Sequence, residues 1–210
     1  MQDHPSDTDV ALRGCTALST LARDDAKTLL IIGAGGIQVI LKAMTAHAGH
    51  TGVNEYGCRA FENLARNSDA NRVTIAAAGA ILVIMKAMTS HAGHAGVNEF
   101  GCWAIANLAA NAANQFTITA AGAIPVILKT MTAHAGHAGV NEQGCRALGR
   151  MVCSDPAIQQ AAKVLPSPPF PTIPPSPDPL LLPPFPSTYD PTTHLRYMTP
   201  PYCPALLARP

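Results

Sequence analysis

Charged and aromatic residues are scarce in this chain of 210 residues. Only 13% of the residues are Asp, Glu, Lys or Arg, the formal net charge is +1, and aromatic residues make up 5% with a single tryptophan. A near-neutral chain lacks the basic surface expected of a nucleic-acid-binding protein. Because 48% of the residues are hydrophobic, a disordered polyelectrolyte is also excluded for most of the chain.

Long apolar runs and targeting segments are absent as well. The longest apolar run, residues 29–41, contains three glycines and a glutamine, and it is shorter than the roughly 20 residues that span a bilayer. The first ten residues, MQDHPSDTDV, are acidic and polar, which is the opposite of a secretory or mitochondrial leader. We therefore expect a cytoplasmic or nuclear protein with no membrane insertion.

Proline is rare in the first 165 residues, which hold Pro5, Pro125 and Pro156, whereas sixteen of the nineteen prolines lie in residues 166–210. Proline lacks a backbone N–H and interrupts both helices and sheets. The sequence therefore predicts a folded body at residues 8–164 and a disordered proline-rich tail at residues 165–210.

Internal repeats define the organisation of the body. The segments HAGHTGVNEYGCRAFENLA, HAGHAGVNEFGCWAIANLA and HAGHAGVNEQGCRALGRMV begin at His47, His91 and His134, with spacings of 44 and 43 residues. Related segments ahead of them also recur. The spacing predicts a partial unit, three full units and a terminal stub, at residues 8–24, 25–67, 68–110, 111–153 and 154–164.

The sequence of each full unit predicts three helices. The short first helix ends at Gly35, Gly79 or Gly122, where a left-handed residue allows a sharp turn. The second helix carries apolar residues at helical spacing, and the third follows a polar loop, with one cysteine per unit that we interpret as a small buried residue. No unit buries its apolar faces alone, so the units are expected to stack into one continuous core.

Three segments resemble armadillo repeats, namely AGAI at 78–81, AGAIPVIL at 121–128 and GCWAIANLA at 101–109. The period also fits armadillo-like repeats of about 40–47 residues. The resemblance implies an all-α, right-handed superhelical solenoid. It also implies a non-catalytic scaffold without a cofactor, which binds a partner protein or an extended peptide along a groove lined by third helices.

One pair on the outer stripe of a third helix is similar to the importin-α type of armadillo protein, in which tryptophan and asparagine one turn apart hold an extended basic peptide. Trp103 and Asn107 match this pair, but arginines replace the tryptophan in the neighbouring units. The arginines favour a ligand with acidic side chains, and recognition of a nuclear-import signal is the alternative. The expected groove residues are Arg59, Asn63, Trp103, Asn107, Arg146 and Arg150.

The HAGH loops support a second alternative. Neutral imidazoles bind zinc, so a metal-binding protein or metal-dependent enzyme would use the loop histidines, although one loop supplies only two ligands. The simpler interpretation is a solvated loop that was copied with its unit. The candidate ligands are His47, His50, His91, His94, His134 and His137.

The ends of the repeat array carry no obvious capping units. Solenoids normally end in units with a polar outer face, whereas Leu12, Leu18 and Leu21 in the first partial unit require a neighbour. We therefore expect self-association through the uncapped solenoid ends, or a longer array of which this chain is a piece.

Overall fold

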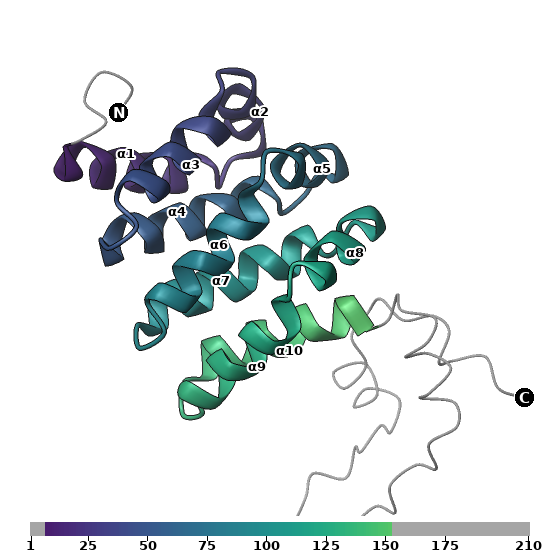
Figure 1. Ribbon diagram of the computed structural model, residues 1–210. Helices are drawn as coiled ribbons and strands as arrows, with labels where there is room; N and C mark the ends of the chain where they lie inside the picture. The colour runs from purple at the N-terminus through teal and green to yellow at the C-terminus, as the bar shows by residue number, and fades with distance from the viewer. Residues whose placement is uncertain (1–6, 153–210) are drawn as a thin grey trace, which may run out of the picture. The chain divides into compact units, whose positions relative to one another are not determined.

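A computed structural model describes residues 7–152, and within that range the chain is entirely helical, with no strand. The predicted all-α fold is therefore confirmed. The helices, labelled in Figure 1, are α1 (Thr8–Leu21), α2 (Asp25–Gly33), α3 (Gly36–Ala46), α4 (Thr51–Leu64), α5 (Asp69–Ala77), α6 (Ala80–Ser90), α7 (Ala95–Leu108), α8 (Ala112–Ala120), α9 (Ala123–Ala133) and α10 (Ala138–Val152).

Helices of equal length recur along the chain. The helices α2, α5 and α8 have nine residues each, α3, α6 and α9 have eleven, and α4 and α7 have fourteen. Each nine-residue helix begins after a polar residue whose side chain accepts a backbone hydrogen bond, which satisfies one of the open N–H groups of the first turn. These residues are Asp24, Ser68 and Asn111.

Glycine forms each connection between the nine-residue and the eleven-residue helices. Gly35, Gly79 and Gly122 have φ angles of 78°, 87° and 81° and form the left-handed turns that the sequence predicts. The paired helices bend by 72–75° at these points. In the described part of the chain, no single helix is long and apolar enough to span a membrane, and only these bent pairs reach the required length and composition together.

The helices form two layers in Figure 1. The longest helices lie in one row, in which α4 packs on α1, α7 on α4 and α10 on α7. The helices α3, α6 and α9 form a second row that covers α4, α7 and α10 respectively. We call α4, α7 and α10 the third helices, because each is the last helix of its unit.

The core lies between these rows and continues from unit to unit. Ile40 and Met44 of α3 and Phe61 of α4 are at most 1% exposed, and the equivalent residues of the next unit belong to the same cluster. Met44 packs so closely on Gly57 that a Cβ atom there would lie 2.5 Å from its Cγ. Small residues on the third helices therefore set the close approach of the two layers.

The recurring cysteines follow the prediction in three of four units. Cys15, Cys58 and Cys102 are fully buried, whereas Cys145 on α10 is exposed. Burial raises the pKa of the Cys15 thiol to about 11 and that of Cys102 to about 12. The expected burial of Cys145 is wrong because, in the described residues, no helix packs on the outer side of α10.

The chain divides after Ser154, and all described residues lie in the first part. The predicted stub at residues 154–164 and the predicted tail at residues 165–210 therefore lie outside the described residues. The predicted boundaries at residues 24, 67 and 110 fall in the connections that precede α2, α5 and α8.

Candidate functional site

Three expected groove residues occupy equivalent positions on neighbouring third helices. Arg59 on α4, Trp103 on α7 and Arg146 on α10 each follow the recurring cysteine of their helix. Arg59 and Trp103 are half-buried, and Arg146 is exposed. Because α4 packs on α7 and α7 on α10, these side chains form a row across three units.

The expected outward orientation of Asn63 and Asn107 is wrong. Asn63 is 5% exposed, and its Nδ2 donates a hydrogen bond of 3.0 Å to the Ser19 carbonyl on α1. Asn107 is 3% exposed, and its Nδ2 donates to the Glu62 carbonyl at the same distance. Both amides therefore connect successive helices of the row, because the preceding helix packs directly over this position.

Arg150 takes the place of these asparagines on α10. Its Nη1 donates to the Ala106 carbonyl on α7, and it lies 3.4 Å from the Asn107 Oδ1. The side chain is half-buried. The guanidinium group therefore serves the contact between α10 and α7, where sequence reasoning placed it in an open groove.

An aromatic residue that sequence reasoning missed lies next to Arg59. The Cζ of Arg59 lies 5.0 Å from the centre of the Phe100 ring on α7, which is within the range of a cation–π contact. Tyr56, Phe100 and Gln143 share this position in their units, two residues before the cysteine. The recurrence of an aromatic residue at this position, Tyr56 and then Phe100, is the sequence signal that could have predicted an aromatic contact beside Arg59.

Glu62 on α4 is a second residue that sequence reasoning missed, and it is 4% exposed. Burial raises the pKa of its carboxyl group, while the guanidinium groups of Arg66, Arg59, Arg23 and Arg146 act in the opposite direction. Four arginines thus lie within electrostatic range of one buried carboxyl group. The repeat pattern does not predict a buried acid at this position, since the equivalent residues in the other units are Ser19, Ala106 and Gly149.

We call these four arginines, Arg23, Arg59, Arg66 and Arg146, the arginine surface. Arg66 donates from Nη2 to the Arg23 carbonyl at 3.0 Å, which ties the ends of α4 and α1 together. Its buried Nε has no hydrogen-bond partner in the described structure. This region therefore combines the four cations of the arginine surface with one buried acid, Glu62, and one buried N–H donor that has no partner.

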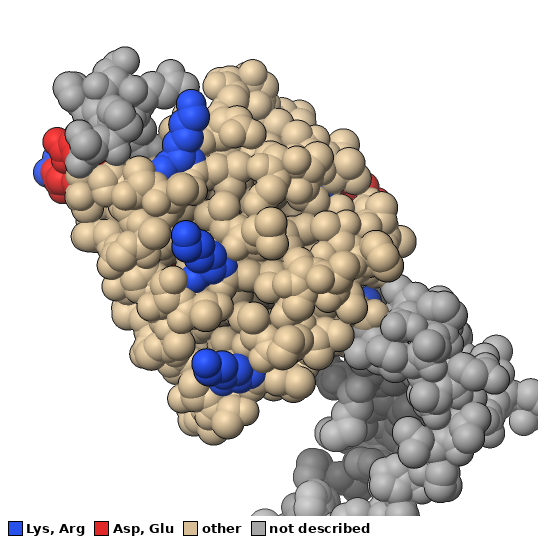
Figure 2. All heavy atoms as spheres, viewed as in Figure 1, with Lys and Arg blue, Asp and Glu red and all other residues tan. Residues whose placement is uncertain are grey.

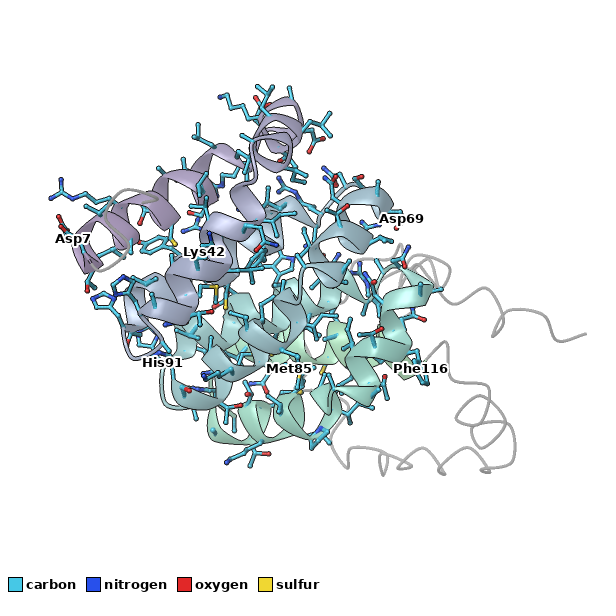
Figure 3. The ribbon with its side chains drawn as sticks, turned by 45° about the horizontal axis from the view of Figure 1, so that its top comes forward. Asp7, Lys42, Asp69, Met85, His91 and Phe116 are labelled. Atoms are coloured by element: carbon cyan, nitrogen blue, oxygen red, sulfur yellow. The ribbon has the colours of Figure 1, made fainter. Side chains whose placement is uncertain are left out.

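The first histidine of each HAGH loop contacts an earlier part of the chain. The Nε2 atoms of His91 and His134 donate to the carbonyls of Ala48 and Ala92 at 2.9 and 2.8 Å, and the Nδ1 of His47 lies 3.1 Å from the Thr8 hydroxyl. Figure 3 shows His91 at the loop edge of the molecule, far from Phe116 at the end formed by the nine-residue helices. These imidazoles connect neighbouring units.

The second histidine of each loop caps a third helix. The Nδ1 atoms of His50, His94 and His137 accept hydrogen bonds from the backbone N–H three residues later, at 3.2–3.4 Å. An acceptor Nδ1 is unprotonated, so each ring is neutral in this role. The histidines that were candidate metal ligands thus have structural contacts in the described loops.

Glutamates of the preceding unit accompany two of these caps. The carboxylates of Glu55 and Glu99 lie 3.9 Å from the Nδ1 of His94 and His137. A Cβ at Gly96 would lie 2.8 Å from the Glu55 Cδ, so glycine leaves space for the carboxylate beside the helix N-terminus, where negative charge is favourable. Within residues 7–152, no group of three or more His, Cys, Asp or Glu residues is arranged to hold a metal ion.

No protein-family model matches the chain, and no curated protein matches it. Among solved structures, it is similar to an engineered protein from the Northeast Structural Genomics Consortium, with 25% sequence identity and a TM-score of 0.65. The similarity covers 74% of this chain and 61% of the engineered protein, so the chain spans about three fifths of that protein's length. The similarity supports the all-α fold.

Proposed function

We propose that this chain is an armadillo-like solenoid that acts as a non-catalytic protein-interaction module. The recurrence of nine-, eleven- and fourteen-residue helices supports the repeat architecture. The row from α1 to α10, in which each helix packs on the one before it, supports stacking of the units along one direction. A stacked array presents the same helix face repeatedly, which suits an extended ligand.

The ligand we propose is an extended peptide with acidic side chains, and the arginine surface carries this proposal. Four guanidinium groups lie within electrostatic range of one carboxyl group, and the burial of that carboxyl group favours its neutral form. Guanidinium groups bind carboxylates and phosphates through paired hydrogen bonds. The half-buried ring of Trp103 adds an apolar contact.

In this proposal the expected groove residues divide into two groups. Arg59, Trp103 and Arg146 contact the ligand, because their side chains are at least partly accessible. Asn63 and Asn107 hold the helices below it, since their Nδ2 groups already bind the neighbouring helix. Arg150 belongs to the second group for the same reason.

Selection of random displayed peptides on the full chain tests the proposal. We expect enrichment of acidic peptides, and exchange of Arg59→Glu together with Arg146→Glu should remove that preference. Trp103→Ala should weaken binding by about 2 kcal/mol, as loss of a central aromatic anchor does. Lys27→Glu on α2, an equal charge change on a nine-residue helix, serves as the control for each arginine.

Two results would contradict this function. Enrichment of lysine-rich peptides would support the nuclear-import alternative instead. Loss of helical circular dichroism in Trp103→Ala, with no binding defect separable from unfolding, would place Trp103 in the core and remove it from the ligand-binding group.

A further inference from the structure

A row of lysines lies on the layer formed by α3, α6 and α9, on the side of that layer that faces away from the third helices. Lys42, Lys86 and Lys129 are each the seventh residue of their helix, on α3, α6 and α9, and all three are exposed. Figure 2 shows basic side chains in a line on this face, with acidic side chains only at its margins. We call these three residues the lysine row.

The charge of the lysine row is not neutralised locally. The helices α3, α6 and α9 contain no Asp or Glu, and none of the three lysines has an ion pair within 4.0 Å in the described structure. The threonines one turn later, Thr45, Thr89 and Thr132, donate to carbonyls of their own helices at 2.7–2.9 Å. The row is therefore available to an anionic partner.

The spacing of the row selects the conformation of that partner. Packed helices lie about 8–10 Å apart, so equivalent lysines on neighbouring units recur at about this interval. A polyproline II segment has three residues per turn and a rise of about 3.1 Å, which places every third side chain on one side at about 9 Å. A β-strand repeats its side chains at about 7 Å instead, which does not match.

We propose that the lysine row binds an acidic segment of a partner protein in the polyproline II conformation, with Asp or Glu at every third position. The three carboxylates would each meet one lysine. A small pocket whose lining includes Met44, Val83 and Lys86 lies between α3 and α6 beside the central lysine. Its volume of about 30 Å³ accommodates a methyl-sized group of the residue next to the central acid.

Charge complementarity favours an acidic peptide over other anions. Nucleic-acid-binding domains usually have a pI above about 9, whereas the pI of this chain is about 7.7. Recognition of anionic lipid headgroups usually takes about 4–8 clustered basic residues, and the lysine row has three in a single line. A narrow, evenly spaced row fits one extended chain best.

A fluorescein-labelled peptide of four Glu-Pro-Pro triplets tests the proposal by fluorescence anisotropy with the full chain. The measurement is made at about 0.01 M salt, where the Debye length is about 30 Å. We expect saturable binding that weakens at least about tenfold when Lys42, Lys86 and Lys129 are all changed to Glu, because three ion pairs become repulsive contacts. Lys27→Glu should change the affinity less than about twofold, because Lys27 lies outside the row and is already 3.9 Å from Asp24.

A peptide of the same composition with its four glutamates consecutive is the control for spacing, and it should bind several-fold more weakly. Equal binding of that control, equal binding of a helical peptide with glutamate at every seventh position, or no binding of the triplet peptide would overturn the proposal. Binding of phosphatidylserine vesicles or single-stranded DNA in preference to the triplet peptide would overturn it too. The loss of affinity caused by changing Lys42, Lys86 and Lys129 should be equally large in a Trp103→Ala background, which separates this result from the proposed function.

Discussion

Glu62 is the buried acid on which the four residues of the arginine surface act electrostatically. Its carboxyl group lies on α4 with only 4% of the residue exposed, and burial outweighs the attraction of four arginines, so that its pKa rises above the ordinary value of 4.5. An acid with a raised pKa in the folded state prefers to be protonated there. Its contribution to stability is therefore fully present below pH 4.5 and is lost as the pH rises through the raised pKa.

We expect Glu62→Gln to raise the melting temperature at neutral pH, because glutamine keeps the shape of the side chain without a buried charge. Below pH 4.5 the variant and the original chain should melt alike, since both side chains are then neutral. Thermal unfolding followed by circular dichroism across this range measures the effect. Glu142→Gln, at an exposed glutamate, is the control. A lower melting temperature for Glu62→Gln at neutral pH would show that the arginine contacts outweigh the cost of burial.

Local patterns predict some site residues but not their environment. The position of Trp103 one residue after a recurring cysteine is visible in the sequence, and the structure leaves it partly accessible. The burial of Asn63 is not visible, because it depends on the carbonyl of Ser19 on α1, 44 residues away. Helical periodicity assigns a residue to a face of its own helix, but the neighbouring helix decides how much of that face is covered.

At the scale of the helices, Gly101 of α7 sets the distance to α6. A Cβ at Gly101 would lie 2.5 Å from the Met88 Cγ. We expect Gly101→Ala to lower the free energy of unfolding by about 1–3 kcal/mol, as overpacking of a close contact does, although alanine is the better helix former.

Chemical denaturation measures this change, and Gly149→Ala on α10 is a matched control, because Gly149 is also helical and a Cβ there meets no atom within 4 Å. If Gly101→Ala is as stable as the control, then Met88 moves aside freely and glycine is not required at this crossing.

Helix boundaries were predicted well where a local signal marks them. The three glycines before α3, α6 and α9 adopt the predicted left-handed conformation, because the steric advantage of glycine at positive φ is local. The polar loop before the third helices carries no such signal for their first residue, and α4 begins at Thr51. The reason is that His50 caps the helix with its Nδ1 atom, and histidine is not a usual capping residue.

At the scale of the whole described region, the buried amides of Asn63 and Asn107 connect α1 to α4 and α4 to α7. Each change to alanine should lower the free energy of unfolding by about 1–3 kcal/mol, because a buried carbonyl loses its donor. Urea denaturation of the single variants measures the cost. Asn67→Ala is the control, since the contact of Asn67 with Asp25 is exposed, and it should change stability by less than about 0.5 kcal/mol. Equal costs for buried and exposed asparagines would mean that these amides do not hold the row together.

The same hydrogen bonds allow the chain to be lengthened or shortened by whole units. Asn63 donates backward to α1, while the neighbouring Glu62 offers its carbonyl forward to Asn107, so one unit brings both a donor and an acceptor. Duplication of a DNA segment that encodes one whole unit would insert both together and leave no buried amide without a partner. An insertion of half a unit would separate donor from acceptor, so gene rearrangements should be tolerated in whole units only.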